Sequence, residues 1–167
     1  MGDHAAGLSV FGRQRRRIDR RQNRFIVRMD DQERALIRQL LSELRELLAL
    51  SPEDPRVRRL YPSAYADDAE LENEYRSLTR EELQSGRLAS IEVVESSVDA
   101  ELLDIDQLTA WMQAVNSLRL VLGTMLDITD DDHDLSFDPN DPNARTVALY
   151  GYLGGLLDEI VDAQLSD

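Results

Sequence analysis

The sequence contains no cysteine and no lysine, and aromatic residues make up only 5% of its 167 positions. Without cysteine, the chain cannot use a disulfide framework, a thiolate zinc site, a cysteine nucleophile or a thiol redox switch. No apolar run approaches the roughly 20 residues that span a membrane, and the N-terminus lacks the apolar stretch of a signal peptide. These absences predict a cytoplasmic protein that does not bind membranes.

All positive charge comes from arginine, and much of it lies near the N-terminus. Acidic residues outnumber arginines 33 to 19, so the net charge is −14. Residues 13–28 combine eight arginines with one aspartate, a local charge of +7, which leaves −21 for the rest of the chain. This basic arm would attract acidic partners or nucleic acid, whereas the acidic body would repel nucleic acid and anionic membranes. The predicted partner-binding residues are its arginines: Arg13, Arg15, Arg16, Arg17, Arg20, Arg21, Arg24 and Arg28.

The apolar pattern predicts an all-α fold, a bundle of about five helices preceded by a short basic β-ribbon. We divide the chain into residues 1–29, a flexible end with the basic arm or ribbon, and residues 30–167, a helical domain. Residues 24–29 are β-branched and aromatic between arginines, which is typical of a short strand. The stretch 15–19 is expected to pair with this strand across residues 20–23.

Capping signals and apolar spacing locate the helices. The first is expected to begin at the capping box Asp30–Glu33 and to end at Ser51-Pro52. Further signals predict a short helix near 68–77, a helix from the capping box Thr79–Glu82 to about 98, a central helix opened by Asp104 and Gln107, and a last helix from Asp141-Pro142 to about 164.

The acidic loop 127–142 is similar to a calcium-binding loop, because Asp130, Asp132 and Asp134 alternate. The sixth position is Leu135, where a calcium loop needs glycine, and the twelfth is Asp141 in place of a bidentate glutamate. We therefore interpret the segment as a solvated loop. His133 within it has no second histidine or cysteine at a ligand spacing.

The remaining candidate sites have simpler structural interpretations. Adjacent carboxylates fall at expected helix starts, where they complement the helix dipole. The glycines at 151, 154 and 155 interrupt a helical pattern and do not follow a strand, so they are expected to let another helix approach closely. We predict no enzymatic activity, no metal and no cofactor. A homodimer through the glycine- and leucine-rich faces remains one possibility.

Two stretches, 61–83 and 110–124, resemble an actinobacterial family of unknown function whose members include transcriptional and oxidative-stress regulators (AosR-like). The first begins Tyr-Pro-Ser-Ala-Tyr-Ala-Asp-Asp, and the second runs Ala-Trp-Met-Gln-Ala-Val-Asn-Ser-Leu-Arg. The resemblance covers about residues 25–153. The structural or interaction residues taken from these stretches are Tyr65, Asp67, Asp68, Trp111, Asn116 and Arg119.

The resemblance implies a regulatory protein-interaction module that contacts a sigma factor or RNA polymerase and acts in transcription or a stress response. Redox-sensing relatives use a cysteine pair, which this chain lacks. Two alternatives remain: an accessory to Clp-type protease adaptors, and direct nucleic-acid binding through the arginine-rich arm.

Asn116 and Arg119 lie three residues apart, on one side of the central helix. They form either a polar spot that binds a partner or an internal network. We favour the network, with Arg119 paired to a carboxylate of Asp67, Asp68 or Glu74, because a half-buried arginine usually needs an acidic partner.

Overall fold

The computed structural model of the protein describes residues 15–50, 53–129 and 137–166. This part of the chain is mostly helical and carries a small antiparallel sheet of order β1-β2-β3. The predicted fold class, a helical bundle with a short N-terminal ribbon, is confirmed. In chain order the elements are β1 (Ile18–Arg21), β2 (Arg24–Val27), α1 (Asp31–Leu50), the 3-10 helix η1 (Pro55–Leu60), α2 (Ala69–Ser97), β3 (Leu102–Leu103), α3 (Ile105–Met125) and α4 (Ala144–Leu165).

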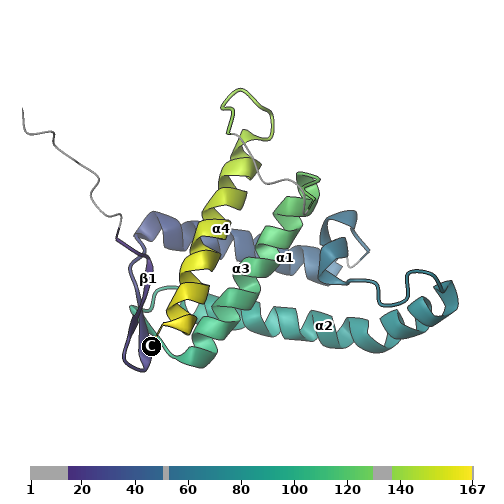
Figure 1. Ribbon diagram of the computed structural model, residues 1–167, viewed down its shortest axis with the longest axis horizontal. Helices are drawn as coiled ribbons and strands as arrows, with labels where there is room; N and C mark the ends of the chain where they lie inside the picture. The colour runs from purple at the N-terminus through teal and green to yellow at the C-terminus, as the bar shows by residue number, and fades with distance from the viewer. Residues whose placement is uncertain (1–14, 51–52, 130–136, 167) are drawn as a thin grey trace, which may run out of the picture.

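The helices α3 and α4 lie side by side and cross in front of α1 and α2 (Figure 1). The sheet sits at one end of the molecule, where β1 packs against α4. At the opposite end, the first half of α2 and the chain before it extend away from the body (Figure 1). The hairpin and the start of α2 are therefore far apart.

The helix α3 is the centre of the core because it contacts α1, α2, α4, η1 and β2. Only Asp106 and Arg119 carry charge in its 21 residues. Trp111 is completely buried, and its indole Nε1 donates to Ser97 Oγ at 2.9 Å. The predicted capping box is confirmed, since the Asp104 side chain accepts from Gln107 N and the Gln107 side chain accepts from Asp104 N.

The predicted capping box at the start of α1 is confirmed as well. Glu33 N donates to Asp30 Oδ1 at 2.8 Å, and Asp30 N donates to Glu33 Oε2 at 3.1 Å. This reciprocal pair satisfies two backbone donors at the helix start, as a capping box does.

The prediction of two helices within residues 68–98 was wrong, because α2 is one continuous helix of 29 residues. Asp68 caps its start, accepting from Glu70 N and Leu71 N. Thr79 caps nothing; its Oγ1 donates to Tyr75 O at 2.8 Å. A threonine inside a helix commonly bonds the carbonyl four residues back, so its presence did not mark a helix start.

Three smaller features also depart from the prediction. Neither η1 nor the two-residue strand β3 was expected, and both are too short for a periodic signal. The last helix begins at Ala144 with Asn143 as its N-cap, slightly later than Asp141-Pro142 suggested. Asp141 instead accepts from Asn143 N at 2.8 Å in a turn before the helix. Within the described ranges, no helix is long and apolar enough to cross a membrane.

Candidate protein-interaction surface

The basic arm folds as a β-hairpin whose two faces differ. Ile18 pairs with Val27, and Arg20 with Phe25, in the antiparallel register. The apolar side chains Ile18, Phe25 and Val27 share one face of the hairpin and are buried in the core, and Arg20 lies on the same face nearer the turn, where it is exposed. On its other edge β2 pairs with β3 through Phe25 and Leu103. The expected hairpin is confirmed, but its bounds were wrong: the first strand is Ile18–Arg21 in place of 15–19, and the turn is residues 22–23 in place of 20–23, because Arg20 and Arg21 continue the pairing up to a two-residue turn.

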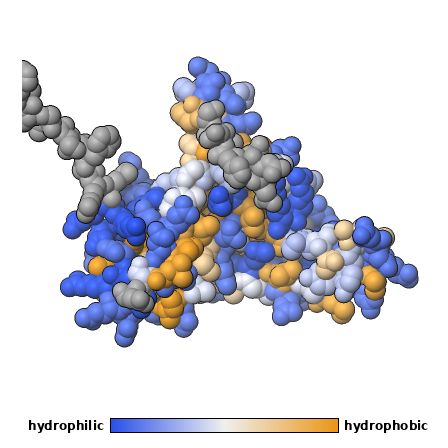
Figure 2. All heavy atoms as spheres, viewed as in Figure 1, coloured by the Kyte–Doolittle hydropathy of each residue, from blue (hydrophilic) through white to orange (hydrophobic). Residues whose placement is uncertain are grey.

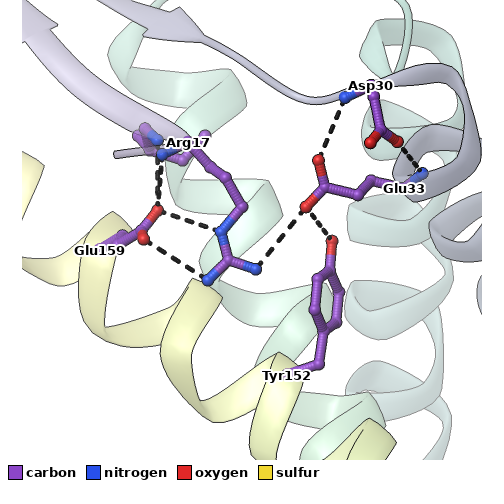
Figure 3. A network of polar contacts seen from close by, with 6 residues as sticks. Arg17, Asp30, Glu33, Tyr152 and Glu159 are labelled. Atoms are coloured by element: carbon purple, nitrogen blue, oxygen red, sulfur yellow. Dashed lines mark hydrogen bonds and ion pairs between the residues drawn. The ribbon is translucent and has the colours of Figure 1, made fainter. Parts of the chain in front are cut away.

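The base of the hairpin is fixed to the acidic body through Arg17 (Figure 3). Arg17 N and Nε donate to Glu159 Oε2 of α4 at 2.9 and 3.3 Å. Its Nη1 lies 3.8 Å from Glu33 Oε1 of α1, and its guanidinium lies 4.8 Å from the centre of the Tyr152 ring. The Tyr152 hydroxyl donates to the same Glu33 oxygen at 3.2 Å. One arginine thus joins β1, α1 and α4.

The contacts and burial within this network shift the pKa values of Arg17 and Tyr152. Partial burial acts to lower the pKa of Arg17, but the hydrogen bond and charge of Glu159 prevail and raise it. Burial, together with the nearby negative charge of Glu33, raises the pKa of Tyr152 to about 12. Arg17 therefore stays charged and Tyr152 stays neutral at ordinary pH, which suits a structural anchor.

Three more arginines of the arm have partners within the protein. Arg16 lies 3.6 Å from Asp162, and Arg28 lies 3.2 Å from Asp19. Arg20 donates to backbone oxygens of Gln22 and Ser166. Exposed pairs such as Arg16 with Asp162 contribute little to stability.

The side chains of the other arginines in the described part of the arm are exposed and bond to no described residue: Arg15, Arg21 and Arg24. Arg21 and Arg24 face each other directly across the strands at the hairpin tip. Like charges in this position destabilise a β-ladder. Figure 2 shows that this end of the molecule has a largely hydrophilic surface. We call Arg21 and Arg24, with the exposed Arg20 beside them, the hairpin tip. Arg13 lies outside the described residues.

The first of the two stretches that carry the resemblance forms the protruding end of the molecule. Tyr65 is half-exposed and meets the Tyr75 ring edge-on, with the ring centres 6.0 Å apart. Asp67 is exposed, and Asp68 serves as the N-cap of α2. The sequence argument missed Glu72, which is buried and accepts from Ala64 N at 3.1 Å and Tyr65 N at 2.7 Å.

Glu72 holds the loop before α2 against the helix. Its carboxylate also accepts from Arg76 Nε at 3.1 Å. The Tyr65 backbone bond, followed by the Arg76 and Ala64 bonds, lowers the pKa of Glu72 despite its desolvation. The only sequence signal for this role is its spacing four residues after Asp68 and four before Arg76.

The second stretch provides core packing and one exposed polar residue. Trp111 is buried, as described above, whereas Asn116 is exposed on α3. The predicted pairing of Arg119 with a carboxylate was wrong: among the described residues it forms no ion pair, and its guanidinium lies 4.9 Å from the centre of the Tyr150 ring. The residues proposed as its partners lie at the start of α2 or just before it, whereas α4 packs beside α3 and supplies the aromatic ring.

The acidic-loop hypothesis falls mainly outside the described residues, since Asp130, Asp132, His133, Asp134 and Leu135 are not among them. In the described remainder, no group of three or more His, Asp or Glu side chains is arranged to hold a metal ion.

Comparison with known proteins gives one match. A family model described as Domain of unknown function (DUF2017) matches residues 15–164. No curated protein and no solved structure matches the chain. The matched range starts at the first described residue of the arm and includes the described helices except the last residue of α4.

Proposed function

Because the chain belongs to the DUF2017 family, a domain of unknown function, we propose its role from the geometry of the hairpin. The protein is a non-enzymatic regulatory module that binds an acidic surface of a protein in the transcription machinery, a sigma factor or RNA polymerase. The resemblance of residues 61–83 and 110–124 to actinobacterial stress regulators supports this class of partner. The absence of cysteine means that no thiol switch takes part.

One observation carries the proposal. Arg21 and Arg24 are opposed and exposed, and no described carboxylate pairs with them, although the body carries a large excess of acid. At the base of the hairpin, by contrast, Arg17 binds the carboxylate of Glu159. An acidic partner surface would relieve the repulsion at the tip and would speed association more than it adds affinity.

Three of the titratable groups with shifted pKa values have structural roles, which agrees with a non-enzymatic function. Glu72 is bonded to the loop before α2, and Tyr152 and Arg17 are bonded within the network at the base of the hairpin. Catalytic groups with shifted pKa values need access to a substrate. These three are instead held by bonds that join elements of the fold.

The test is a pull-down from nuclease-treated actinobacterial cytoplasm at about 0.15 M salt, where screening is already substantial. The tip variant is Arg21→Ser with Arg24→Ser, and both side chains are exposed. The matched control is Arg38→Ser with Arg58→Ser, which removes the same charge from exposed positions outside the hairpin, where each arginine forms only an exposed ion pair.

Recovery of RNA polymerase or a sigma factor by the wild type and the control, with loss in the tip variant, supports the proposal. Recovery of Clp components in the same pattern favours the protease-adaptor alternative. Binding that needs added nucleic acid and falls steeply with salt favours direct nucleic-acid binding. Equal recovery by the tip variant rejects the hairpin tip as the contact.

A further inference from the structure

A second surface, separate from the hairpin, lies between α1 and the adjoining ends of α3 and α4. It is an open groove of about 610 Å³. Its floor and walls are mainly apolar and include Leu36, Leu40, Leu44 and Leu47 of α1 and Leu118 and Met125 of α3. On α1 the four leucines follow helical spacing over 11 residues, which corresponds to about 17 Å of helix. The groove is therefore long enough to hold about three turns of another helix.

The bottom and the mouth of the groove differ in exposure. Leu40, Leu44 and Leu118 are buried and form part of the core. Leu36 and Leu47 are only partly buried, and Met125 at the mouth is 50% exposed. Exposed methionine is common on surfaces that accept helices of varied sequence, because its side chain is flexible. The apolar surface thus continues from the core to the open side.

The rim of the groove carries opposite charges on its two sides. Along α1 stand Gln39, Glu43 and Glu46, all exposed. Glu43 accepts only an amide hydrogen bond from Gln39, at 3.1 Å, and Glu46 bonds to no described residue. Across the groove, Arg145 at the start of α4 is exposed and bonds to no described residue either.

We propose that this groove binds an amphipathic helix of a partner protein, apolar on the inserted face and carrying lysine or arginine along the side that meets Glu43 and Glu46. An apolar groove of this length can accept the i, i+4 and i+7 side chains of an inserted amphipathic helix. The carboxylates of Glu43 and Glu46 favour basic residues on the side of the bound helix that faces α1. Arg145 favours acidic residues on the opposite side of that helix. A second copy fits less well, since it would bring the same acidic rim and another −14 of charge.

The probe is a fluorescein-labelled designed peptide of about 18 residues, long enough to form a helix. It has leucine at i, i+4, i+7 and i+11, with lysine along one flank. A scrambled peptide of the same composition and a version with glutamate in place of lysine serve as controls. Binding is measured by fluorescence anisotropy on the full chain.

We expect saturable binding of the lysine peptide and at least tenfold weaker binding of the scrambled one. Glu43→Arg with Glu46→Arg should weaken binding of the lysine peptide at least tenfold and strengthen binding of the glutamate peptide. The control Glu81→Arg with Glu82→Arg makes the same charge change at exposed sites on α2 and should change affinity less than twofold. Met125→Ser should weaken binding of both the lysine peptide and the glutamate peptide.

Equal binding of the scrambled peptide, or an equal loss in the α2 control, would show attraction to the acidic body in general and would overturn the proposal. So would the absence of saturable binding to the wild type. The tip variant with serine at 21 and 24 should bind the peptide normally, so this surface and the hairpin can fail independently.

Discussion

Several arginines in the interior bond to carbonyl oxygens and aromatic rings instead of carboxylates. Arg34 is buried and donates to the backbone oxygens of Met29, Val98 and Ala100. Arg87 donates to Leu60 O at 2.8 Å and to Ser117 Oγ at 2.9 Å, and desolvation lowers its pKa. In the described chain neither forms an ion pair. An acidic composition therefore does not guarantee that a buried arginine meets an acid.

Replacing Arg34 with methionine tests how much these carbonyl bonds contribute. Arg34→Met keeps much of the apolar stem but removes the donors at the end of α2 and the chain after it. Because hydrogen bonds from a charged donor are worth about 1.5–3 kcal/mol and the carbonyls would lose their partner, we expect a loss of about 3 kcal/mol in the free energy of unfolding. Urea denaturation measures the change.

The control lies one turn further along α1. Arg38→Met removes an exposed arginine that pairs with Asp99 at 2.7 Å. An exposed pair contributes at most about 1 kcal/mol, so this variant should remain close to the wild type. Equal losses in the two variants would contradict the importance of the carbonyl bonds.

The hydroxyl of Tyr152 predicts a specific loss of stability in alkali. Its pKa is about 12 in the folded protein, against an ordinary value near 10. Between pH 10 and pH 12 the hydroxyl loses its proton in the unfolded chain but keeps it in the folded protein. The contribution of this hydroxyl to stability is therefore fully present below pH 10 and is lost as the pH rises toward 12. Wild type should lose about 2 kcal/mol more over this interval than Tyr152→Phe, as followed by urea denaturation at each pH. Parallel curves for the two proteins would argue against the raised pKa.

At the scale of the element, glycines in helices differ according to what surrounds them. At Gly86, inside α2, a Cβ would meet nothing within 4 Å. At Gly155, in α4, it would lie 3.2 Å from Arg17 Nη2, and at Gly154 it would lie 3.5 Å from Arg119 Nε. The expectation that glycines 151, 154 and 155 admit another helix was wrong for Gly151, which faces open space, and for Gly155, which borders Arg17 of the arm; Gly154 faces the side chain of Arg119 on α3.

Alanine substitutions separate these two environments. Gly86→Ala should raise the free energy of unfolding by about 0.5–1 kcal/mol, because alanine favours the helix and no atom is displaced. Gly155→Ala should give a smaller gain or a loss, since the new methyl group presses on the arginine that binds Glu159. Thermal unfolding of both variants measures the two changes in stability. An equal increase in each would show that Arg17 moves aside without a loss of stability.

The same elements show how far sequence predicts this fold. Local signals located α1 and α3, because Asp30 with Glu33 and Asp104 with Gln107 form bonds within one turn of helix. Thr79 gave the same local pattern inside α2, where the continuing helix overrode it. The strand β3 depends on pairing with β2, far away in sequence, so no local pattern indicated it.

The sequence predicted that the arginines of the arm form the candidate site. It did not predict which of them bind within the protein and which are exposed at the hairpin tip. The count of arginines in the arm was available from sequence, whereas the separation of Arg17 from Arg21 depends on where α4 packs. Residue type alone cannot distinguish an arginine that anchors the hairpin from one at its tip, because both are flanked by similar residues. The groove along α1 is likewise invisible in sequence, since leucines at its walls and in the core have the same spacing.

At the scale of the whole molecule, the hairpin belongs to the core of the helical body. Ile18, Phe25, Val27 and Met29 are all buried there, and Arg17 ties β1 to two helices. Burying each such side chain is worth about 1.5–3 kcal/mol, so together they approach the 5–15 kcal/mol that stabilises a typical domain. Residues 30–167 alone should therefore fail to unfold cooperatively. Trp111, the one tryptophan of the chain, should then fluoresce as a solvent-exposed residue.

The matched comparison is the full chain with serine at positions 21 and 24, which keeps the buried residues of the hairpin. This variant should melt at or slightly above the wild-type temperature, because it removes a like-charge pair worth about 0.2–1 kcal/mol. If residues 30–167 instead melted cooperatively with a buried Trp111, the hairpin would be an appendage, and its apolar contacts would be dispensable. The predicted outcome makes the arm both a structural part of the domain, through its inward side chains, and a binding surface, through its tip.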